Sequence, residues 1–437
     1  MALIAAAACA LPIGTLARPL AVIGALIVAG TAAASAWAGA AGGPGGFASA
    51  ILVLVGVLFA AGAAASGGVA GPRGYFALWS LLLAATASAV VATDLIVFVA
   101  SWESMLLPLI LLVWLWGAAD RRRAALRLAL MWLTGSALLL TGIVALGVGA
   151  HTFAFADLAG YRLAAGSQFV LALLFLAAFA VRLPLFPLHA WLAPACGAAP
   201  TPVAMVLCAA TPAVAVYAIA RICVPFFPVA MSDLAPYLAA LAAIGALYAA
   251  FLAARQHDAR TFVAYASLSQ VQLVAASAFA ATPTGAAGAL LAACVHGLAI
   301  AAVILLIAAL AQRAGTSVLG PRGIAGRVPV QTALTVIALL ISIGSPSDFL
   351  VLAAVFGISP GVGLVASLGV IASAAYAAIF LRRLLNTTGV ADAADLGWRE
   401  RGPAVALIGL ALVLVAVPGV VTDIATRTAS QITRTGR

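Results

Sequence analysis

The chain has 437 residues, of which 66% are hydrophobic and only 7% are charged. About a quarter of the residues of a soluble globular domain are usually charged, so this composition excludes a soluble enzyme. The formal net charge of +10 does not indicate nucleic-acid binding, because the basic residues stand singly or in short segments between long apolar runs.

Apolar segments of span length recur from residue 2 to residue 420, and about 20 helical residues are enough to cross a bilayer core. The sequence therefore predicts an all-α integral membrane protein with about 14 transmembrane helices. No basic segment precedes the first span and Arg18 follows it, so we expect a membrane span there and not a cleaved signal peptide. The predicted spans are 2–15, 19–40, 47–66, 75–93, 95–117, 124–149, 168–192, 201–221, 234–254, 261–281, 286–312, 329–356, 361–381 and 403–420.

The charged residues of the connections favour one orientation. Arginines occupy every second connection, whereas the others hold Asp94, Asp157 with Arg162, and Asp233, or no charge at all. By the positive-inside rule, the arginine-rich side is the cytoplasmic side of a bacterial-type inner membrane, and 14 spans then leave both termini outside. Three arginines in the C-terminal tail oppose this orientation, but tail charges weigh less than those of short loops.

Two predicted spans contain helix breakers beside an ionisable residue. The seventh is interrupted at Pro184 and Pro187, and the twelfth at residues 343–348. Helices broken at corresponding positions of two halves are typical of repeats that hold an ion site near the midplane. Because the breaks lie five spans apart, we predict two inverted five-helix repeats at 75–233 and 234–385, with three spans at 1–74 before them and a last span and tail at 386–437.

Few ionisable side chains lie inside predicted spans, where a charge is costly and usually functional, and the most informative are Glu103, Arg182, His296 and Asp348. A carboxylate in such a place needs a partner, and Arg182 is the obvious candidate for Glu103. The structural alternatives are a helix-end arginine that reaches the headgroups and a histidine that is simply satisfied in the core. Together the four residues could form a polar axis suited to moving protons or small cations.

Four further residues could hold water or pass on a hydrogen bond. They are His189 beside the first break and Tyr265, Ser267 and Gln270 in the tenth span. They argue only weakly for transport, and a structural cap remains the alternative for His189.

All 21 basic residues are arginine, and lysine is absent. Codon bias explains this composition, but it has a chemical consequence. Arginine is not deprotonated in proteins, so the basic side chains of this chain cannot release a proton as a lysine can. The cysteines form no CxxC pair, so we expect buried thiols, no metal site, no redox cofactor and no catalytic centre in this chain. The five cysteines are Cys9, Cys196, Cys208, Cys223 and Cys294.

Several short elements follow one another in order over roughly residues 75–385. They are Ser101-Trp102-Glu103, Leu183 to Trp191 with Ala199-Pro200-Thr201-Pro202, Tyr217 with Arg221, Asp258-Ala259-Arg260 with Ala264-Tyr265-Ala266-Ser267, His296-Gly297-Leu298 and Asp348-Phe349-Leu350. This series resembles the antiporter-like subunits that respiratory complex I, membrane-bound hydrogenases and multisubunit cation/proton antiporters share.

The resemblance implies a proton path in which Glu103, His296 and Asp348 take the roles of the family's titratable groups on the fifth, eleventh and twelfth spans. The sequence departs from the family at three positions: Arg182 replaces the lysine of the first broken helix, Ala213 the lysine of the eighth span, and Gln270 a histidine or lysine of the tenth. The usual chain of titratable groups is therefore incomplete.

Three functions follow from the resemblance and remain open. The first is a membrane-arm subunit of a complex I-like or hydrogenase-like assembly that conducts or couples protons. Its expected partners are other membrane-arm subunits, a soluble or peripheral redox module, the lipid bilayer and protons, but no nucleic acid. The second is a non-pumping structural or coupling subunit. The third is the membrane subunit of a cation/proton antiporter or of an inorganic-carbon uptake complex.

Overall fold

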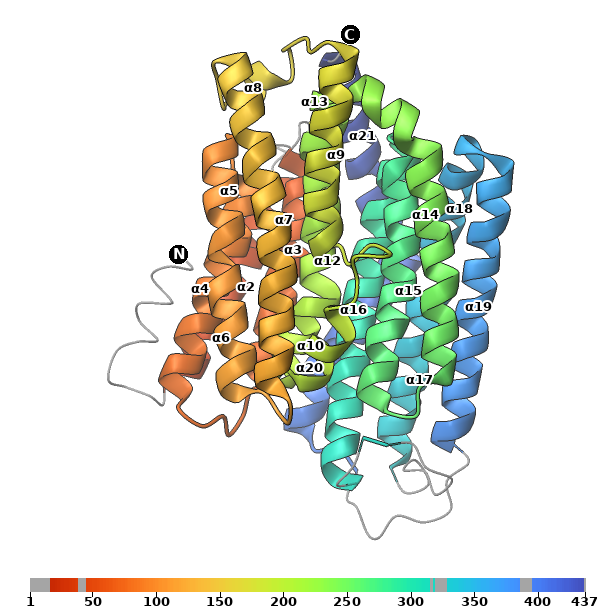
Figure 1. Cartoon of the computed structure of the whole chain (residues 1–437). Helices are drawn as coiled ribbons and strands as arrows, with labels where there is room; N and C mark the ends of the chain where they lie inside the picture. The colour runs from red at the N-terminus through yellow and green to blue at the C-terminus, as the bar shows by residue number, and fades with distance from the viewer. Residues whose placement is uncertain (1–15, 38–44, 315–316, 319–327, 386–394, 436–437) are drawn as a thin grey trace.

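A computed structural model of the chain describes residues 16–37, 45–314, 317–318, 328–385 and 395–435. Within these ranges the chain is all-helical apart from two isolated β-bridges, and the long helices run side by side as one tall bundle (Figure 1). The helices are α2 Ala17–Trp37, α3 Gly45–Ala65, α4 Pro72–Val91, α5 Leu95–Ser104, α6 Leu106–Trp116, α7 Arg121–Ala150, α8 Phe155–Leu158, α9 Ala165–Arg182, α10 Leu192–Ala198, α11 Thr201–Met205, η2 Val206–Ala210, α12 Thr211–Ala218, η3 Ile219–Cys223, α13 Val224–Phe226, α14 Pro228–Arg255, α15 Ala259–Phe279, α16 Pro283–Ala314, α17 Pro329–Ile343, α18 Pro346–Ile358, α19 Pro360–Leu385, α20 Trp398–Ala416 and α21 Gly419–Thr435.

The described residues contain 12 helical stretches that are long and apolar enough to cross a membrane. A thirteenth is counted if α20 and α21, which meet at a bend of 67°, form one further span. The predicted first span, residues 2–15, lies outside the described residues, so the structure supports a multi-pass helical membrane protein with 12 or 13 spans in its described part. The seventh predicted span is shorter than expected, because α9 ends at Arg182.

The bundle has a buried centre and a lipid-facing surface. The membrane-spanning stretch of α16 is buried throughout, and α3, α15, α17, α18, α20 and α21 pack around it. By contrast, only a third of α7 is buried, and its leucines at positions 126, 130, 133 and 140 are exposed. A helix that is apolar on all sides can be surrounded either by protein or by lipid, and this fold contains both kinds.

The helix of α9 ends halfway along the bundle, and the chain continues without regular helix to α10 (Figure 1). Two side chains pair with carbonyl groups near this interruption: Trp191 Nε1 donates to Val181 O at 2.8 Å, and Gln272 Nε2 of α15 donates to Pro184 O at 3.0 Å. Non-helical backbone at membrane depth is tolerated where protein satisfies it in this way. Gly245 lets α14 approach closely, since a Cβ there would lie 2.8 Å from Phe186 Cβ.

A second interruption separates α17 from α18 at Gly344 and Ser345. The hydroxyl groups of Ser345 and Ser347 contact each other at the start of α18. The central helix α16 comes very close to this segment at Gly288, where a Cβ would lie 3.1 Å from the backbone nitrogen of Val351. Only glycine allows this approach without a shift of the backbone.

The two isolated bridges have the same construction. In the first, Leu95 N–H donates to Phe153 O at 2.9 Å, and the Asp94 carboxylate caps α5 by accepting from Val97 N–H at 2.8 Å. In the second, Ala259 N–H donates to Ser317 O at 2.8 Å, and the Asp258 carboxylate caps α15 by accepting from Thr261 N–H at 2.8 Å. The chain enters α5 at the upper end of the bundle in Figure 1 and enters α15 at the lower end.

Candidate functional site

Arg182 is the last residue of α9, and its side chain is only 2% exposed. Its guanidinium carbon lies 4.3 Å from the ring centroid of Trp102 and 4.4 Å from that of Trp132. Nη1 also donates to the Trp102 backbone carbonyl at 2.7 Å. The guanidinium is therefore enclosed by two indole rings inside the protein, where cation–π attraction is strongest, and it does not reach the headgroups.

Glu103 follows Trp102 in α5, and its side chain is 34% exposed. One carboxylate oxygen, Oε2, accepts a hydrogen bond of 2.5 Å from Ser136 Oγ of α7. The other, Oε1, lies 3.8 Å from Arg182 Nη2, and neither of these two atoms has a hydrogen-bond partner among the described residues. A separation of 3.8 Å is too long for a direct hydrogen bond but is within the range of an ion pair.

The segment beside Arg182 belongs to η2, a π-helical turn within the eighth span. A cavity of about 10 Å³ borders Arg182 and is also lined by Val206, Ala210 and Thr211. Ala213, which stands where the family has a lysine, is buried in the helix that follows. Single π-helical turns inside a helix occur frequently at functional sites, because they shift the register of the backbone hydrogen bonds.

His296 lies near the middle of α16, and 5% of it is exposed. Its Nδ1 is 2.9 Å from Ser342 Oγ of α17, and its Nε2 is 3.2 Å from Ser267 Oγ of α15. Ser267 Oγ itself donates to the Cys208 backbone carbonyl at 2.9 Å. Since that hydroxyl has only one proton, it accepts from His296, which assigns the proton of the neutral imidazole to Nε2. Each ring nitrogen thus has a hydroxyl partner.

Asp348 lies in the first turn of α18, directly after the second interruption. It is partly buried, and its helix packs against α19, which carries the Tyr376 hydroxyl. Gln270 Nε2 lies 3.5 Å from the same hydroxyl, which donates to Ala266 O at 3.3 Å. Tyr376 therefore connects the tenth predicted span with the neighbourhood of Asp348.

The structure thus places the predicted residues in two groups, and the four ionisable side chains do not form one connected cluster. Glu103 and Arg182 form the first group, and His296 with Ser267 belongs to the second. In the part of the chain that the structure describes, no side-chain hydrogen bond joins the groups; the backbone of η2 lies between them, with Ala210 facing the first and Cys208 O the second.

The remaining predicted residues lie apart from these groups. His189 packs its ring against Phe186 and Tyr248, at centroid distances of 5.7 and 5.4 Å, on the side facing α14. Tyr265 lines a separate cavity of about 440 Å³ together with Asp120 and Arg123 at the end of the bundle that holds the arginine-rich connections. Neither residue contacts Arg182 or His296 through a hydrogen bond in the described chain.

Several residues of the site escaped the sequence analysis. The indole of Trp132, the hydroxyls of Ser136 and Ser342, the phenol of Tyr376 and the amide of Gln272 all contact the site or support its interruption. Gln272 could have been found, because a glutamine within an apolar helix needs a buried partner. The others carry no signal in the sequence, since tryptophan and serine are common in membrane helices. Among the described residues, no group of three or more His, Cys, Asp or Glu is placed to hold a metal ion.

Comparison with known proteins places this geometry in context. Residues 92–374 match the protein family described as NADH:quinone oxidoreductase/Mrp antiporter, transmembrane. The chain is 30% identical over 374 residues to NADH-quinone oxidoreductase subunit M of Rhodobacter capsulatus, covering 80% of this chain and 73% of that protein. It is 35% identical over 339 residues to NADH-quinone oxidoreductase subunit 13 of Thermus thermophilus, covering 75% of this chain and 72% of that protein.

Solved structures give the same result. A chain of respiratory complex I from Thermus thermophilus aligns with a TM-score of 0.86 at 30% identity, covering 100% of both chains. A chain of an archaeal membrane-bound sulfane sulfur reductase aligns with a TM-score of 0.90 at 20% identity, covering 100% of this chain and 98% of that one, and this similarity shows the fold alone. The family match, the two sequence relatives and the complex I structure agree, and the chain belongs to the NADH:quinone oxidoreductase/Mrp antiporter family of transmembrane subunits.

Proposed function

We propose that this chain is an antiporter-like membrane-arm subunit of a complex I-like assembly and that it conducts protons or couples their translocation to that assembly. The observation that carries the proposal is the pair of Glu103 and Arg182. A buried arginine faces a carboxylate at 3.8 Å, at the point where a membrane helix is interrupted. Ionisable groups inside membrane proteins are retained at proton and ion pathways, because a purely structural role would rarely repay their cost.

In this proposal Arg182 supplies a fixed charge and Glu103 carries the proton. Arginine stays protonated, so it attracts and orients the carboxylate but does not exchange its own proton. Ser136 holds one oxygen of Glu103, and the other oxygen is buried without a hydrogen-bond partner among the described residues, so we assign proton uptake to this second oxygen. The site therefore differs from a lysine–glutamate switch, in which either partner can change charge.

The second group supports proton passage by a different chemistry. His296 has a hydroxyl on each ring nitrogen, from Ser267 on one side and Ser342 on the other. A neutral imidazole can take up a proton at one nitrogen and release one from the other, and the hydroxyl groups then reorient. We propose that this trio and Asp348 form the second half of the path, with water bridging the distance to Glu103 along η2.

We also propose that the chain contains two inverted five-helix repeats, 75–233 and 234–385, with broken helices at the seventh and twelfth spans, and a fourteenth span when residues 2–15 are included. The two capped bridges support this proposal. Asp94 and Asp258 stand at the start of the second helix of each proposed repeat, make the same hydrogen bonds, and lie at opposite ends of the bundle (Figure 1). An inversion of one repeat relative to the other produces this relation.

The orientation and the partners of the chain are part of the same proposal. The connections from α6 to α7 and from α14 to α15, which are flanked by arginines, lie at the lower end of the bundle in Figure 1, and we assign this end to the cytoplasm of a bacterial inner membrane with both chain termini outside. The similarity to a chain of respiratory complex I supports other membrane-arm subunits and a peripheral redox module as partners.

A second candidate function is a structural or coupling subunit that no longer moves protons. It is favoured by Arg182, which keeps its proton, and by Ala213, which is buried and apolar where the family has a lysine. The two candidates differ in one measurable quantity, the proton flux through the chain in the assembled complex.

The experiment is Glu103→Gln in the intact complex, reconstituted into proteoliposomes with a pH-sensitive dye. Glutamine keeps the shape and the hydrogen bond from Ser136 but removes the site that carries a proton. We expect proton translocation to fall about tenfold or more, in the range of a lost proton-transfer group, while electron transfer by the partner subunits stays measurable. Asp233→Asn, at an exposed position of α14, is the matched control. Unchanged translocation in Glu103→Gln would exclude the proton path and leave the structural subunit.

A further inference from the structure

Two cysteines that play no part in the proposed path lie in direct contact. Cys196 belongs to α10, which follows the first interruption, and Cys208 belongs to η2. Their Sγ atoms are 3.0 Å apart, and the residues are 5% and 1% exposed. The other described cysteines, Cys223 and Cys294, make no contact with a thiol among the described residues. Two thiols from neighbouring helical segments are thus held side by side.

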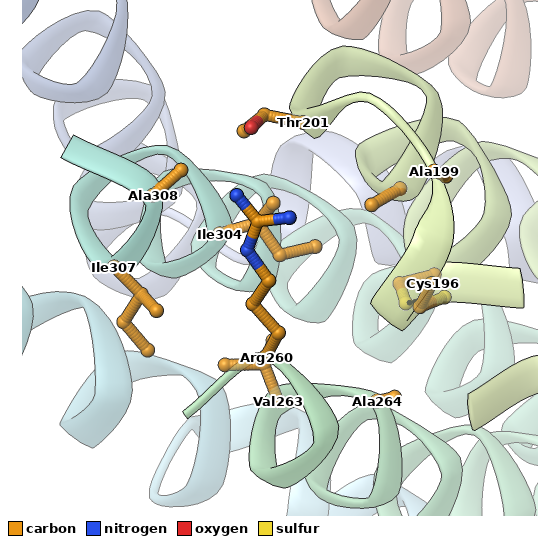
Figure 2. Close-up of a pocket in the computed structure, with 11 residues that line it drawn as sticks. Cys196, Ala199, Thr201, Arg260, Val263, Ala264, Ile304, Ile307 and Ala308 are labelled. Atoms are coloured by element: carbon orange, nitrogen blue, oxygen red, sulfur yellow. Dashed lines mark hydrogen bonds between the residues drawn. The ribbon is translucent and has the colours of Figure 1, made fainter. Parts of the chain in front are cut away.

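A narrow cavity leads to this pair of thiols (Figure 2). Both cysteines line it, together with Arg260 near the start of α15 and Ile304 of α16. Figure 2 shows the Arg260 side chain reaching across the cavity toward Thr201, with Cys196 on the neighbouring wall beside Ala199. The space open to the centre of a water molecule is about 20 Å³, which is enough for about one molecule of the size of water.

We propose that Cys196 and Cys208 form a dithiol oxidation site, which hydrogen peroxide converts into an intramolecular disulfide. The sulfur of Cys196, the more exposed of the two, attacks one peroxide oxygen; an S–O bond forms, the O–O bond breaks, and the thiol proton leaves with the second oxygen as water. The sulfur of Cys208 then attacks the sulfenic acid; the S–S bond forms, the S–O bond breaks, and a second water leaves with the Cys208 proton. Two thiols are oxidised, and one peroxide is reduced to two waters.

The geometry favours the disulfide over further oxidation of either sulfur. The sulfur atoms must approach from 3.0 Å to about 2.05 Å, a movement of about 1 Å, so the second thiol stands ready when the first is oxidised. A cytoplasmic thiol pair is normally kept reduced, so the disulfide would form only under oxidative stress.

The disulfide would fasten α10 to η2. The carbonyl of Cys208 is the acceptor for Ser267 Oγ, which in turn contacts His296. If the chain conducts protons as proposed above, fixing η2 therefore restricts the hydroxyl next to the imidazole, and oxidation lowers the flux. This consequence rests on the proposed function, whereas formation of the disulfide does not.

The chain itself allows a direct test. Cleavage with cyanogen bromide after Met131, Met205 and Met231 separates Cys196, in fragment 132–205, from Cys208, in fragment 206–231. Fragment 206–231 also contains Cys223, so the experiment uses the Cys223→Ser variant as its background. The intact complex in native membranes is treated with hydrogen peroxide, free thiols are blocked with N-ethylmaleimide, and the fragments are analysed by mass spectrometry with and without dithiothreitol.

We expect the two fragments to stay joined after peroxide, with a mass lower by two hydrogen atoms than the sum of the two, and to separate after reduction. The further change Cys196→Ser, with Cys196→Ala as a second version, should abolish the joined product. Separate fragments with N-ethylmaleimide on Cys208, or with sulfinic acid on either sulfur, would overturn the proposal.

The same samples test the effect on protons. Peroxide should at least halve proton translocation in the Cys223→Ser complex, with recovery in dithiothreitol, but should leave Cys196→Ser unaffected. A disulfide that forms without loss of flux would overturn the link to the proton path. A complex with no flux before oxidation would refute the proposed function, and the fragment analysis would still decide the oxidation site.

Discussion

The replacement Arg182→Lys tests how the buried charge is held. The guanidinium lies 4.3 and 4.4 Å from two tryptophan ring centroids, whereas an ammonium group is compact and can lie over one ring at a time. A desolvated cation–π contact is worth about 2 kcal/mol, so losing one of two should destabilise the subunit by roughly 1–2 kcal/mol. The charge itself is kept, so the larger penalty of leaving Glu103 without its partner is avoided.

A double-mutant cycle that combines Arg182→Lys with Trp132→Leu isolates the cation–π contribution of the Trp132 ring, because Trp132→Leu removes this ring and leaves Trp102 in place. The interaction energy between positions 182 and 132 should be about 1–2 kcal/mol, since the two side chains are in direct contact. The assay is thermal unfolding of the purified complex, followed through the fluorescence of a tag on this subunit, where such a change lowers Tm by a few degrees. Asp233→Asn, at an exposed position of α14 outside the ring pair, serves as a control in the same cycle.

Arg182→Lys should lower the stability of the subunit but should not lower its proton translocation. Lysine can release a proton, so proton translocation in Arg182→Lys should equal or exceed that of the natural chain despite the lower stability. Arg182→Lys with unchanged Tm and no coupling to position 132 would refute the argument from the two rings. A flux below that of the natural chain, at normal complex abundance, would refute the argument that arginine limits proton exchange.

Three further variants test neighbouring features. Gln272→Leu removes the amide that donates to Pro184 O at 3.0 Å, and the unpaired carbonyl should cost about 1–2 kcal/mol in thermal unfolding of the complex; a neutral result would show that the interruption does not need this donor. Gly245→Ala places a Cβ 2.8 Å from Phe186 Cβ and should lower the stability of the complex by about 1–3 kcal/mol. Gly409→Ala, with open space around it, is the control and should be neutral or stabilising. Equal effects of the two variants on thermal unfolding would contradict the close packing at Gly245. Ser267→Ala removes one hydroxyl partner of the imidazole and should lower proton translocation without loss of complex abundance; unchanged flux would place the imidazole outside the path.

Much of the architecture could be predicted from the sequence because membrane spans follow from length and hydropathy alone. The low content of charged residues, the regular recurrence of apolar segments and the ordered series of motifs identified a helical membrane protein and its family correctly. The pairing of Glu103 with Arg182 could be anticipated for the same reason, since a carboxylate inside a membrane needs a partner.

The side-chain contacts of the candidate site depend on which faces of the helices meet, and sequence patterns inside a membrane say little about how helix faces pair. Lipid and protein interior are equally apolar, so the hydrophobic pattern does not reveal which side of α7 or α9 faces inward. The rings around Arg182, the hydroxyl partners of His296 and the role of Tyr376 in α19 all depend on such contacts. The separation of Glu103 and Arg182 from His296 and Ser267, with η2 between them, could not be predicted from the sequence either, because it depends on a local change of helix register.

The enclosure of the membrane-spanning stretch of α16 has a consequence for how this protein is assembled. Its sequence is apolar enough to enter a bilayer unaided, so during synthesis it first meets lipid, and later helices such as α18 and α20 must displace that lipid. Exchanging lipid for protein gains little from the hydrophobic effect, and the gain comes from close fit between helices. The many alanines and glycines of α16 provide that fit. Enlarging one of them should therefore harm biogenesis more than replacing a leucine on the lipid-facing helices.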